Sequence, residues 1–539
     1  MRERIRWQRK SRIIPEIAPI EPEGPMQGLE ATFETLKATR NEAAIDVLIA
    51  ALDDERSGTR QAALSAITVR PESRAAEMVL ANWNKLRADD ISSLKGKGRW
   101  MRPAVAAALV SNHDHLASAL DATESLQIFD VLPQVIVLAE SSNVDTIKKR
   151  ATKIILTLVE PLGLKAREGQ DQATIRKPAR SQLVESLNRF SEHHNHHLVD
   201  ALLVISEWGD SDLRRCLSSE SKTHQLICQR LHQSNHPGAI NLLAGFIRRR
   251  KIEPQIAEQI RSRVDVEFRD ALLKTITADP STTVVKNLHK LGIPESLRGG
   301  EAILDDINPN HRAAATHTHV AANGDSIEML HFVVGSVQRG GKGVNTMATF
   351  AMTNCRVPET ELWMPAALVV ASGDEQRILS DPNAHLLQRL IDLLDHPEPA
   401  LVASVRRILR PLHADQMLGH FESLRPQSRR RLGSVMQQID PDLIERVRVA
   451  LRHPVLNHRL QAIAMADALA VVDRLSDSFE QIAQQDHQVA RMQAAEAMGS
   501  ASGERTLGLL QQMTELPDCP VKDAAIKAIQ KRKKSASAN

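Results

Sequence analysis

The most constraining feature of this sequence of 539 residues is a pair of apolar helical segments that recurs at a nearly fixed period. Near the end of the chain, Arg459, Arg491 and Lys522 each stand just inside the second segment of a pair, at separations of 32 and 31 residues. A single helix pair cannot bury its apolar face alone, so consecutive pairs must stack on one another. A period of this size therefore predicts a solenoid built from helix pairs.

The repeats share one order: an apolar helix, a short polar or proline-containing turn, and a second helix that is rich in small residues. In the first clear unit, apolar residues between Ala44 and Leu52 follow helical spacing, and the polar turn 53–58 separates them from the second helix. Small residues there, such as Ala62 and Ala63, allow the second helix to lie close to its neighbour. The units that show this order clearly cover residues 43–67, 386–409 and 441–530.

The clarity of the repeats divides the chain into four parts. We expect degenerate N-terminal and central helical repeats over residues 26–380 and clearer C-terminal repeats over residues 381–530. Residues 1–25 are basic and then proline-rich, and residues 531–539 begin with Lys-Arg-Lys-Lys and continue with small polar residues. These compositions predict a disordered arm before the repeats and a disordered basic tail after them.

The second helix of a pair opens with a recurring motif. A cation follows Thr, Ala or Val, and two consecutive alanines come within the next turn, as at Thr59-Arg60 with Ala62-Ala63, Ala490-Arg491 with Ala494-Ala495, and Val521-Lys522 with Ala524-Ala525. In these motifs the chain resembles the HEAT-repeat family, although Val402 stands at the cation position of the unit 386–409. The resemblance implies an all-α fold, namely an α-solenoid (superhelix) of stacked antiparallel helix pairs of the HEAT and armadillo type.

Composition agrees with a helical, soluble chain. Aromatic residues make up only 3% of it and tyrosine is absent, which argues against an all-β fold. No apolar run approaches the ~20 residues that span a bilayer, so we expect no membrane span. The four cysteines form no CxxC pair, and a reducing cytoplasmic location therefore fits best.

A histidine cluster is the one feature that suggests a metal ion. Of the four histidines between His193 and His197, only these two end residues share a helix face, because they are four residues apart. With nearby carboxylates they could hold zinc or nickel. A polar loop or helix start that faces solvent is the alternative, and it is the one that we favour. His317 and His319 are a weaker pair, since their spacing places them on different helix faces.

Two basic runs suggest an interface for phosphates or for an acidic partner. They are Arg248-Arg249-Arg250-Lys251, which follows an apolar helix, and Arg429-Arg430-Arg431 in the later repeats. On a curved solenoid such residues could line a groove and bind phosphate groups. Alternatively, they are cations that complement the dipoles of helix C-termini or cover exposed helix faces.

The sequence contains no complete catalytic motif among those that we compared. No histidine is followed by Glu, as the iron site of the HEAT-like deoxyhypusine hydroxylases requires. Gly340-Gly341-Lys342-Gly343 lacks both the leading glycine and the Ser or Thr of a P-loop. We therefore predict no catalytic residue and no cofactor.

The sequence thus favours a non-catalytic scaffold or adaptor that binds protein partners through an extended solenoid surface. An alternative is a nucleic-acid-associated protein that uses basic faces and tails, although a net charge of +3 is too balanced to indicate this by itself. A second alternative is a HEAT-like enzyme of the bilin lyase type, for which no particular residue can be assigned.

Overall fold

In the computed structural model of the protein, the structure describes residues 27–111, 114–170, 172–218, 223–324, 326–412 and 426–537. Within these ranges the chain forms helices joined by short connections and no strand. It divides into two compact units between Leu242 and Leu243. The division expected at residue 380 separates degenerate from clear repeats in the sequence, and it stays a prediction.

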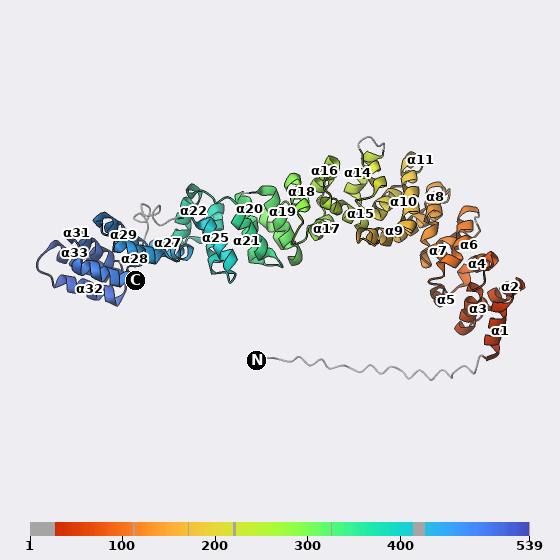
Figure 1. Ribbon diagram of the computed structural model, residues 1–539, viewed down its shortest axis with the longest axis horizontal. Coiled ribbons are helices and arrows are strands. Elements are labelled where there is room, and N and C mark those ends of the chain that lie inside the picture. The colour runs from red at the N-terminus through yellow and green to blue at the C-terminus, as the bar shows by residue number, and fades with distance from the viewer. Residues whose placement is uncertain are drawn as a thin grey trace. The chain divides into compact units, whose positions relative to one another are not determined.

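The first unit, coloured from red to yellow in Figure 1, is a stack of helices in which most helices contact the one two places further along. The contacts join α1 to α3, α2 to α4, α4 to α6, and continue in this way to α12 and α14. The helices are α1 (Gln27–Ala38), α2 (Ala43–Ala50), α3 (Ser57–Thr68), α4 (Ser73–Ala81), α5 (Ala88–Ser93), α6 (Gly98–Ser111), α7 (Leu116–Ser125), α8 (Leu132–Ser141), α9 (Asp145–Arg167), α10 (Ala173–Asn188), α11 (Phe190–His193), α12 (His196–Ile205), α13 (Ser211–Cys216) and α14 (His224–Gln233), with α15 (Pro237–Gly245) crossing the boundary.

The second unit, green to blue in Figure 1, continues the same construction. Its α-helices are α16 (Pro254–Ser262), α17 (Val266–Ile276), α18 (Thr282–Leu291), α19 (Arg312–Asn323), α20 (Ile327–Arg339), α21 (Val344–Asn354), α22 (Thr360–Ser372), α23 (Glu375–Ser380), α24 (Pro382–Asp392), α25 (Pro399–Leu409), α27 (Pro426–Ile439), α28 (Leu443–Leu451), α29 (Leu456–Ala468), α30 (Ser476–Gln485), α31 (Gln488–Met498), α32 (Glu504–Thr514) and α33 (Pro520–Ser537).

Short 3-10 helices lie at the ends of several α-helices and in one longer connection. They are η1 (Ala51–Asp53), η2 (Trp83–Lys85), η3 (Phe129–Val131), η4 (Phe246–Arg248), η5 (Glu295–Leu297), η6 (Gly300–Asp305), η7 (Pro309–His311), η8 (Leu393–Asp395) and η9 (Val472–Leu475).

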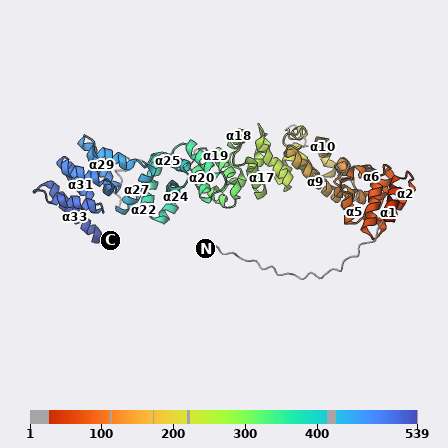
Figure 2. The same cartoon turned by 60° about the horizontal axis from the view of Figure 1, so that its bottom comes forward.

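The last repeats show the stacking most clearly. The helices α28 and α29, α30 and α31, and α32 and α33 pack as pairs, and the second helices α29, α31 and α33 pack against one another. α31 and α33 lie side by side in both Figure 1 and Figure 2. These helix pairs fall where the sequence predicts them, and the all-α fold of stacked antiparallel pairs is confirmed.

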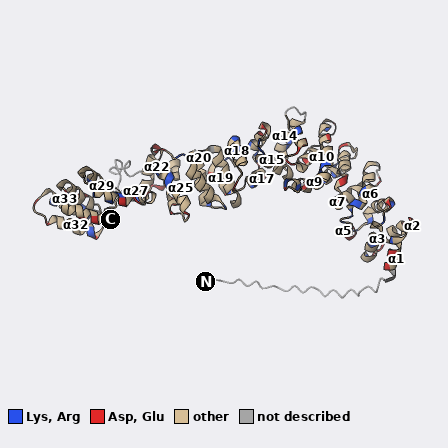
Figure 3. Cartoon of the chain, viewed as in Figure 1, with Lys and Arg blue, Asp and Glu red and all other residues tan. Residues whose placement is uncertain are grey.

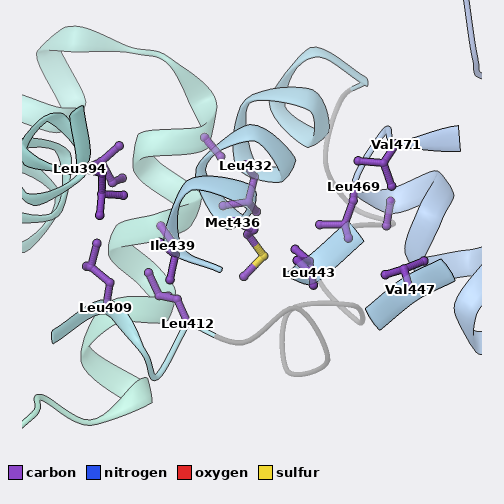
Figure 4. Packing of buried hydrophobic residues seen from close by; sticks show 14 of the residues in the cluster. Leu394, Leu409, Leu412, Leu432, Met436, Ile439, Leu443, Val447, Leu469 and Val471 are labelled. Carbon is purple, nitrogen blue, oxygen red and sulfur yellow. The ribbon is translucent and has the colours of Figure 1, made fainter. Parts of the chain in front are cut away.

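From Ala313 onward the stack of the second unit encloses a continuous apolar core. Buried residues from Ala313 to Ala528 form a single cluster, and Figure 4 shows Leu409 of α25, Met436 of α27 and Leu443 of α28 lying in it. The helices approach closely where small residues face a neighbour. A Cβ atom at Gly433 would lie 2.3 Å from the carbonyl oxygen of Leu469, so only glycine fits there.

A buried arginine at the start of a second helix joins neighbouring repeats. In α3, the Nη1 atom of Arg60 donates to the carbonyl oxygens of Asp54 and Glu55 at 3.0 and 2.9 Å, in the turn of its own pair. Its Nε atom donates to the carboxylate of Asp90 at 2.9 Å, in the next pair. Asp90 in turn accepts the backbone N–H of Arg87 at the start of α5. One guanidinium therefore fixes both a turn and the position of the following helix.

Arg459 makes the same set of bonds at the other end of the chain. It donates to the carbonyl oxygens of His453 and Pro454 at 2.7 and 3.0 Å, and to the carboxylate of Asp486 at 2.7 Å. Burial acts to raise the pKa of Asp486, but hydrogen bonds from Arg459 and from the His487 backbone hold that pKa below its usual value.

The connection from α18 to α19 departs from the repeat. The three 3-10 helices η5, η6 and η7 replace a helix here, and Glu301 of η6 binds Arg339 at 2.7 Å and Arg389 at 2.5 Å. Burial acts to raise the pKa of Glu301, whereas the hydrogen bonds from Arg389 and Arg339 lower it, and the net shift is downward. Glu301 thereby ties this connection to α20 and to α24, whose Arg389 lies 88 residues further along the chain.

The ends of the chain differ partly from expectation. α33 continues to Ser537, so residues 531–537 are helical, because its last turns consist of the good helix formers Lys, Arg, Ala and Gln with few breakers. The arm expected over residues 1–25 lies outside the described residues. No helix in the described part of the chain is long and apolar enough to span a bilayer.

We expect Asp90→Ala to lower the free energy of unfolding of the first unit by about 3–5 kcal/mol, because it leaves the buried guanidinium of Arg60 without its anion. Urea unfolding together with amide hydrogen exchange of α3 to α5 measures this loss. Glu34→Ala, which breaks the exposed pair with Lys37, is the matched control and should have almost no effect. Equal effects of the two variants would contradict the role of the buried pair.

His319 is a core histidine, and its burial predicts a pH dependence. Its ring stacks on Phe332 with centroids 3.5 Å apart, and burial lowers its pKa to about 4 despite a hydrogen bond with the Leu297 backbone. An unfolded histidine has a pKa of about 6.5. As the pH falls, the histidine is therefore protonated in the unfolded chain before it is protonated in the folded one. The contribution of neutral His319 to the free energy of unfolding is full above about pH 6.5 and declines as the pH falls toward 4.

The free energy of unfolding that is lost when His319 becomes protonated should reach about 3 kcal/mol at most. Urea unfolding of the wild type and of His319→Leu, near pH 7 and near pH 4.5, isolates it from other titrating groups. We expect the variant to lose less stability on acidification than the wild type does. The same loss in both proteins would show that His319 does not titrate in this way.

Candidate basic interface

The first predicted basic run begins where the chain leaves the core of the second unit. Phe246 and Ile247 of η4 are fully buried, and the next residues reach the surface. Arg249 turns away from its neighbours: it pairs with Glu253 at 2.9 Å, and its guanidinium lies over the ring of Phe246 at 5.7 Å from the centroid. Arg248 donates from Nη2 to the carbonyl oxygen of Thr275 in α17 at 3.0 Å. The side chains of Arg248 and Arg249 therefore point in different directions.

Arg248 and Arg250 line an open hollow of about 490 Å³. The other wall belongs to α18, and the complete lining, which we call the basic hollow, consists of Arg248, Arg250, Thr283, Lys286, Asn287 and Lys290. Four of these six residues are cations and none is a carboxylate or an aromatic residue. All four cations are exposed. In Figure 3, by contrast, basic and acidic residues are interspersed along both units.

The amphipathic pattern of α18 places two of these cations. Val284, Leu288 and Leu291 are buried, which leaves Lys286 and Lys290, four residues apart, on one exposed face. The Oγ atom of Ser281 caps the helix by accepting the N–H of Val284. The two lysines therefore face the same side of the hollow.

Asn287 holds the two walls of the basic hollow together. Its side chain is 4% exposed, and its Nδ2 atom donates to the carbonyl oxygens of Ile247 at 2.8 Å and Arg249 at 2.7 Å. α18 is thereby fixed against the backbone of the basic run. An arrangement of this kind can bind carboxylate or phosphate oxygens through cations that project from two fixed walls.

The remaining predicted basic residues do not line this hollow. Arg249 and Lys251 lie outside it, and so does the run in α27. There, Arg431 is exposed and lies 3.5 Å from the carbonyl oxygen of Ser372, Arg429 is half-buried, and the side chain of Arg430 is outside the described residues. The run Arg429 to Arg431 as an interface stays a prediction.

The sequence did not single out Lys286, Asn287 or Lys290. Their signal is a pair of lysines four residues apart on a helix whose other face is apolar, a pattern that many exposed helices share. Only the fold shows that this helix lies beside Arg248 and Arg250.

The histidine cluster packs around one aromatic ring. The centroid of Phe190 lies 5.7, 5.6 and 4.9 Å from the rings of His193, His194 and His196, each edge to face. The Nδ1 atom of His193 accepts the backbone N–H of Asn195 at 3.0 Å, so its Nε2 carries the proton and donates to the Ser186 carbonyl oxygen at 3.1 Å. Both ring nitrogens of His193 are therefore used within the chain.

His197 is exposed, and its Nδ1 atom lies 3.8 Å from the carboxylate of Asp200. Among the described residues, no three His, Cys, Asp or Glu side chains come together as metal ligands. A metal ion on His193 and His197 stays a prediction. His193, His194 and His197 also line an open hollow of about 610 Å³ with Asp145 and three lysines of α9, namely Lys148, Lys149 and Lys153.

Comparisons with known proteins add little. No family model and no curated protein matches the chain. Among solved structures, the chain is similar to yeast importin-beta (Kap95p), with 12% identity, TM-score 0.25 and coverage of 95% of this chain and 80% of that one. For She4p the identity is 11%, the TM-score 0.26 and the coverages 95% and 96%. For Kap121p the identity is 13% and the TM-score 0.23, with coverage of 82% of this chain and 49% of that one, so the match spans about half of Kap121p. Likenesses at these TM-scores establish no function.

The geometry predicts different effects for the two histidines. His193→Ala should destabilise the first unit by about 1–2 kcal/mol, because it removes hydrogen bonds at both ring nitrogens, whereas His197→Ala should have little effect. Thermal unfolding of both variants, with and without added zinc chloride, tests this. Stabilisation of the wild type by zinc that both variants lose would instead support the metal site.

Proposed function

We propose that this chain is a non-catalytic scaffold that binds protein partners through the exposed faces of its stacked helices. The observation that carries the proposal is the packing of each unit. Successive helices bury one side against their neighbours, as α29, α31 and α33 do, and leave a long outer face for recognition. Several repeats then contribute to one contact surface, so that no single residue needs to react.

The basic hollow supports the proposal because it is a built feature of that outer face. Its walls are fixed by Asn287, and its cations are exposed and have no carboxylate beside them in the lining. A nucleic-acid partner is the competing proposal, and the experiment below distinguishes the two.

Biotinylated full-length chain, incubated with native lysate before and after nuclease treatment, provides the test. We expect a discrete set of proteins to stay bound after nuclease treatment and to cross-link to exposed helix faces. As a control, the same incubation contains an excess of the unlabelled chain in solution, which competes for the partners and should remove them from the bait. Loss of all bound protein after nuclease treatment, or no protein above the bead background, would overturn the proposal.

A further inference from the structure

We propose that the basic hollow is the docking site for a short acidic segment, rich in Asp or Glu, of a protein partner. This inference rests on the proposed scaffold function and adds the place and the chemistry of one contact.

Charge is the first step of the argument. Arg248, Arg250, Lys286 and Lys290 converge from two elements, and among the described residues none of the four forms an ion pair. The nearest carboxylate along the run, that of Glu253, is already bound by Arg249. Four cations without anions repel one another, and an anionic ligand relieves that repulsion.

Preorganisation is the second step. The amide of Asn287 fixes α18 to the backbone at Ile247 and Arg249, and the guanidinium of Arg248 is held by the carbonyl oxygen of Thr275. The walls of the hollow therefore do not need to be ordered when a ligand binds. Binding then costs less conformational entropy than it would on a mobile loop.

The extent of the basic surface selects the kind of ligand. α17, to which Arg248 is bonded, carries Glu267, Asp270 and the exposed Lys274, and Asp279 follows it, so the surface in that direction is of mixed charge and the cationic surface is not continuous there. A long polyanion needs an extended basic stripe, and single-stranded bases need aromatic side chains to stack on. The lining has no aromatic residue. A short segment with a few carboxylates fits these features better than a nucleic acid does.

The spacing of the lysines agrees with an extended peptide. Side chains four residues apart on a helix lie about 6 Å from each other. In an extended peptide, alternate side chains point to the same side at intervals of about 6.5 Å. A Glu-x-Glu segment can therefore place one carboxylate near Lys286 and the next near Lys290.

Fluorescence anisotropy with the full chain tests the proposal. The probes are a labelled peptide of alternating Glu and Ser, its counterpart with Gln in place of Glu, and a single-stranded RNA with the same number of negative charges. We expect the Glu peptide to bind, the Gln peptide not to bind, and Lys286→Glu with Lys290→Glu to weaken binding by about tenfold or more.

The matched control is Arg452→Glu with Lys527→Glu, which reverses two exposed cations of the same unit that do not line the hollow and lie far from it in the chain. It should weaken binding by less than about twofold. Circular dichroism and the thermal midpoint check that both double variants are folded.

Two results would overturn the docking site. In the first, both double variants weaken binding of the Glu peptide equally. In the second, the RNA binds more tightly than the Glu peptide does, and the Lys286→Glu with Lys290→Glu variant loses that RNA binding. If the Glu peptide fails to bind while the chain still retains proteins from nuclease-treated lysate, only the docking site is overturned. If neither binds, the scaffold proposal is overturned as well.

Discussion

The stack depends on arginines such as the buried Arg60 and the half-buried Arg459, whose guanidinium binds the turn of its own helix pair and an aspartate that joins it to the next helix. Arginine suits this position because its planar fork offers five N–H donors, enough for two carbonyl oxygens and a carboxylate at once. The aspartate then accepts a backbone N–H at the start of the following helix, as Asp486 does from His487. The geometry of one pair thus determines where the next pair begins.

Related bonds at separations of 27–34 residues, about one repeat, occur in the first unit in Arg60–Asp90, Arg176–Asp210 and Arg230–Asp200, and in the second unit in Arg459–Asp486. Arg491, at the equivalent position of the following pair, donates instead to the carbonyl oxygen of Ala483 in its own pair. Lys522, at the equivalent position of the last described pair, binds only Asp518 of its own turn, at 2.8 Å. The basic hollow uses the same principle with an amide, since Asn287 binds two carbonyl oxygens of a neighbouring element. Polar groups inside the stack therefore fix the positions of neighbouring helices, and the exposed cations can bind a partner.

The sequence predicts what is local and periodic. The helix pairs at 43–67 and 441–530 form where the apolar spacing and the turns place them, and the cation of the second helix occupies a repeated position. It does not predict contacts that depend on the path of the chain. The connection of η5, η6 and η7 has no apolar period, and its Glu301 binds Arg389, which lies 88 residues away. Likewise, Lys286 and Lys290 become part of a site only because α18 packs against the basic run, and Arg249 is drawn out of it by Glu253.

Amide hydrogen exchange of the Arg459→Ala chain tests the central claim most directly. If the guanidinium joins two pairs, its removal leaves the carbonyl oxygens of its own turn without their side-chain donor, and Asp486 keeps the backbone N–H of His487 but loses its ion pair. Exchange should then become faster both in α28 and α29 and in α30 and α31, while the distant helices of the first unit stay unchanged. Faster exchange confined to the turn at His453 and Pro454 would show that the arginine holds only its own pair, and would contradict the account.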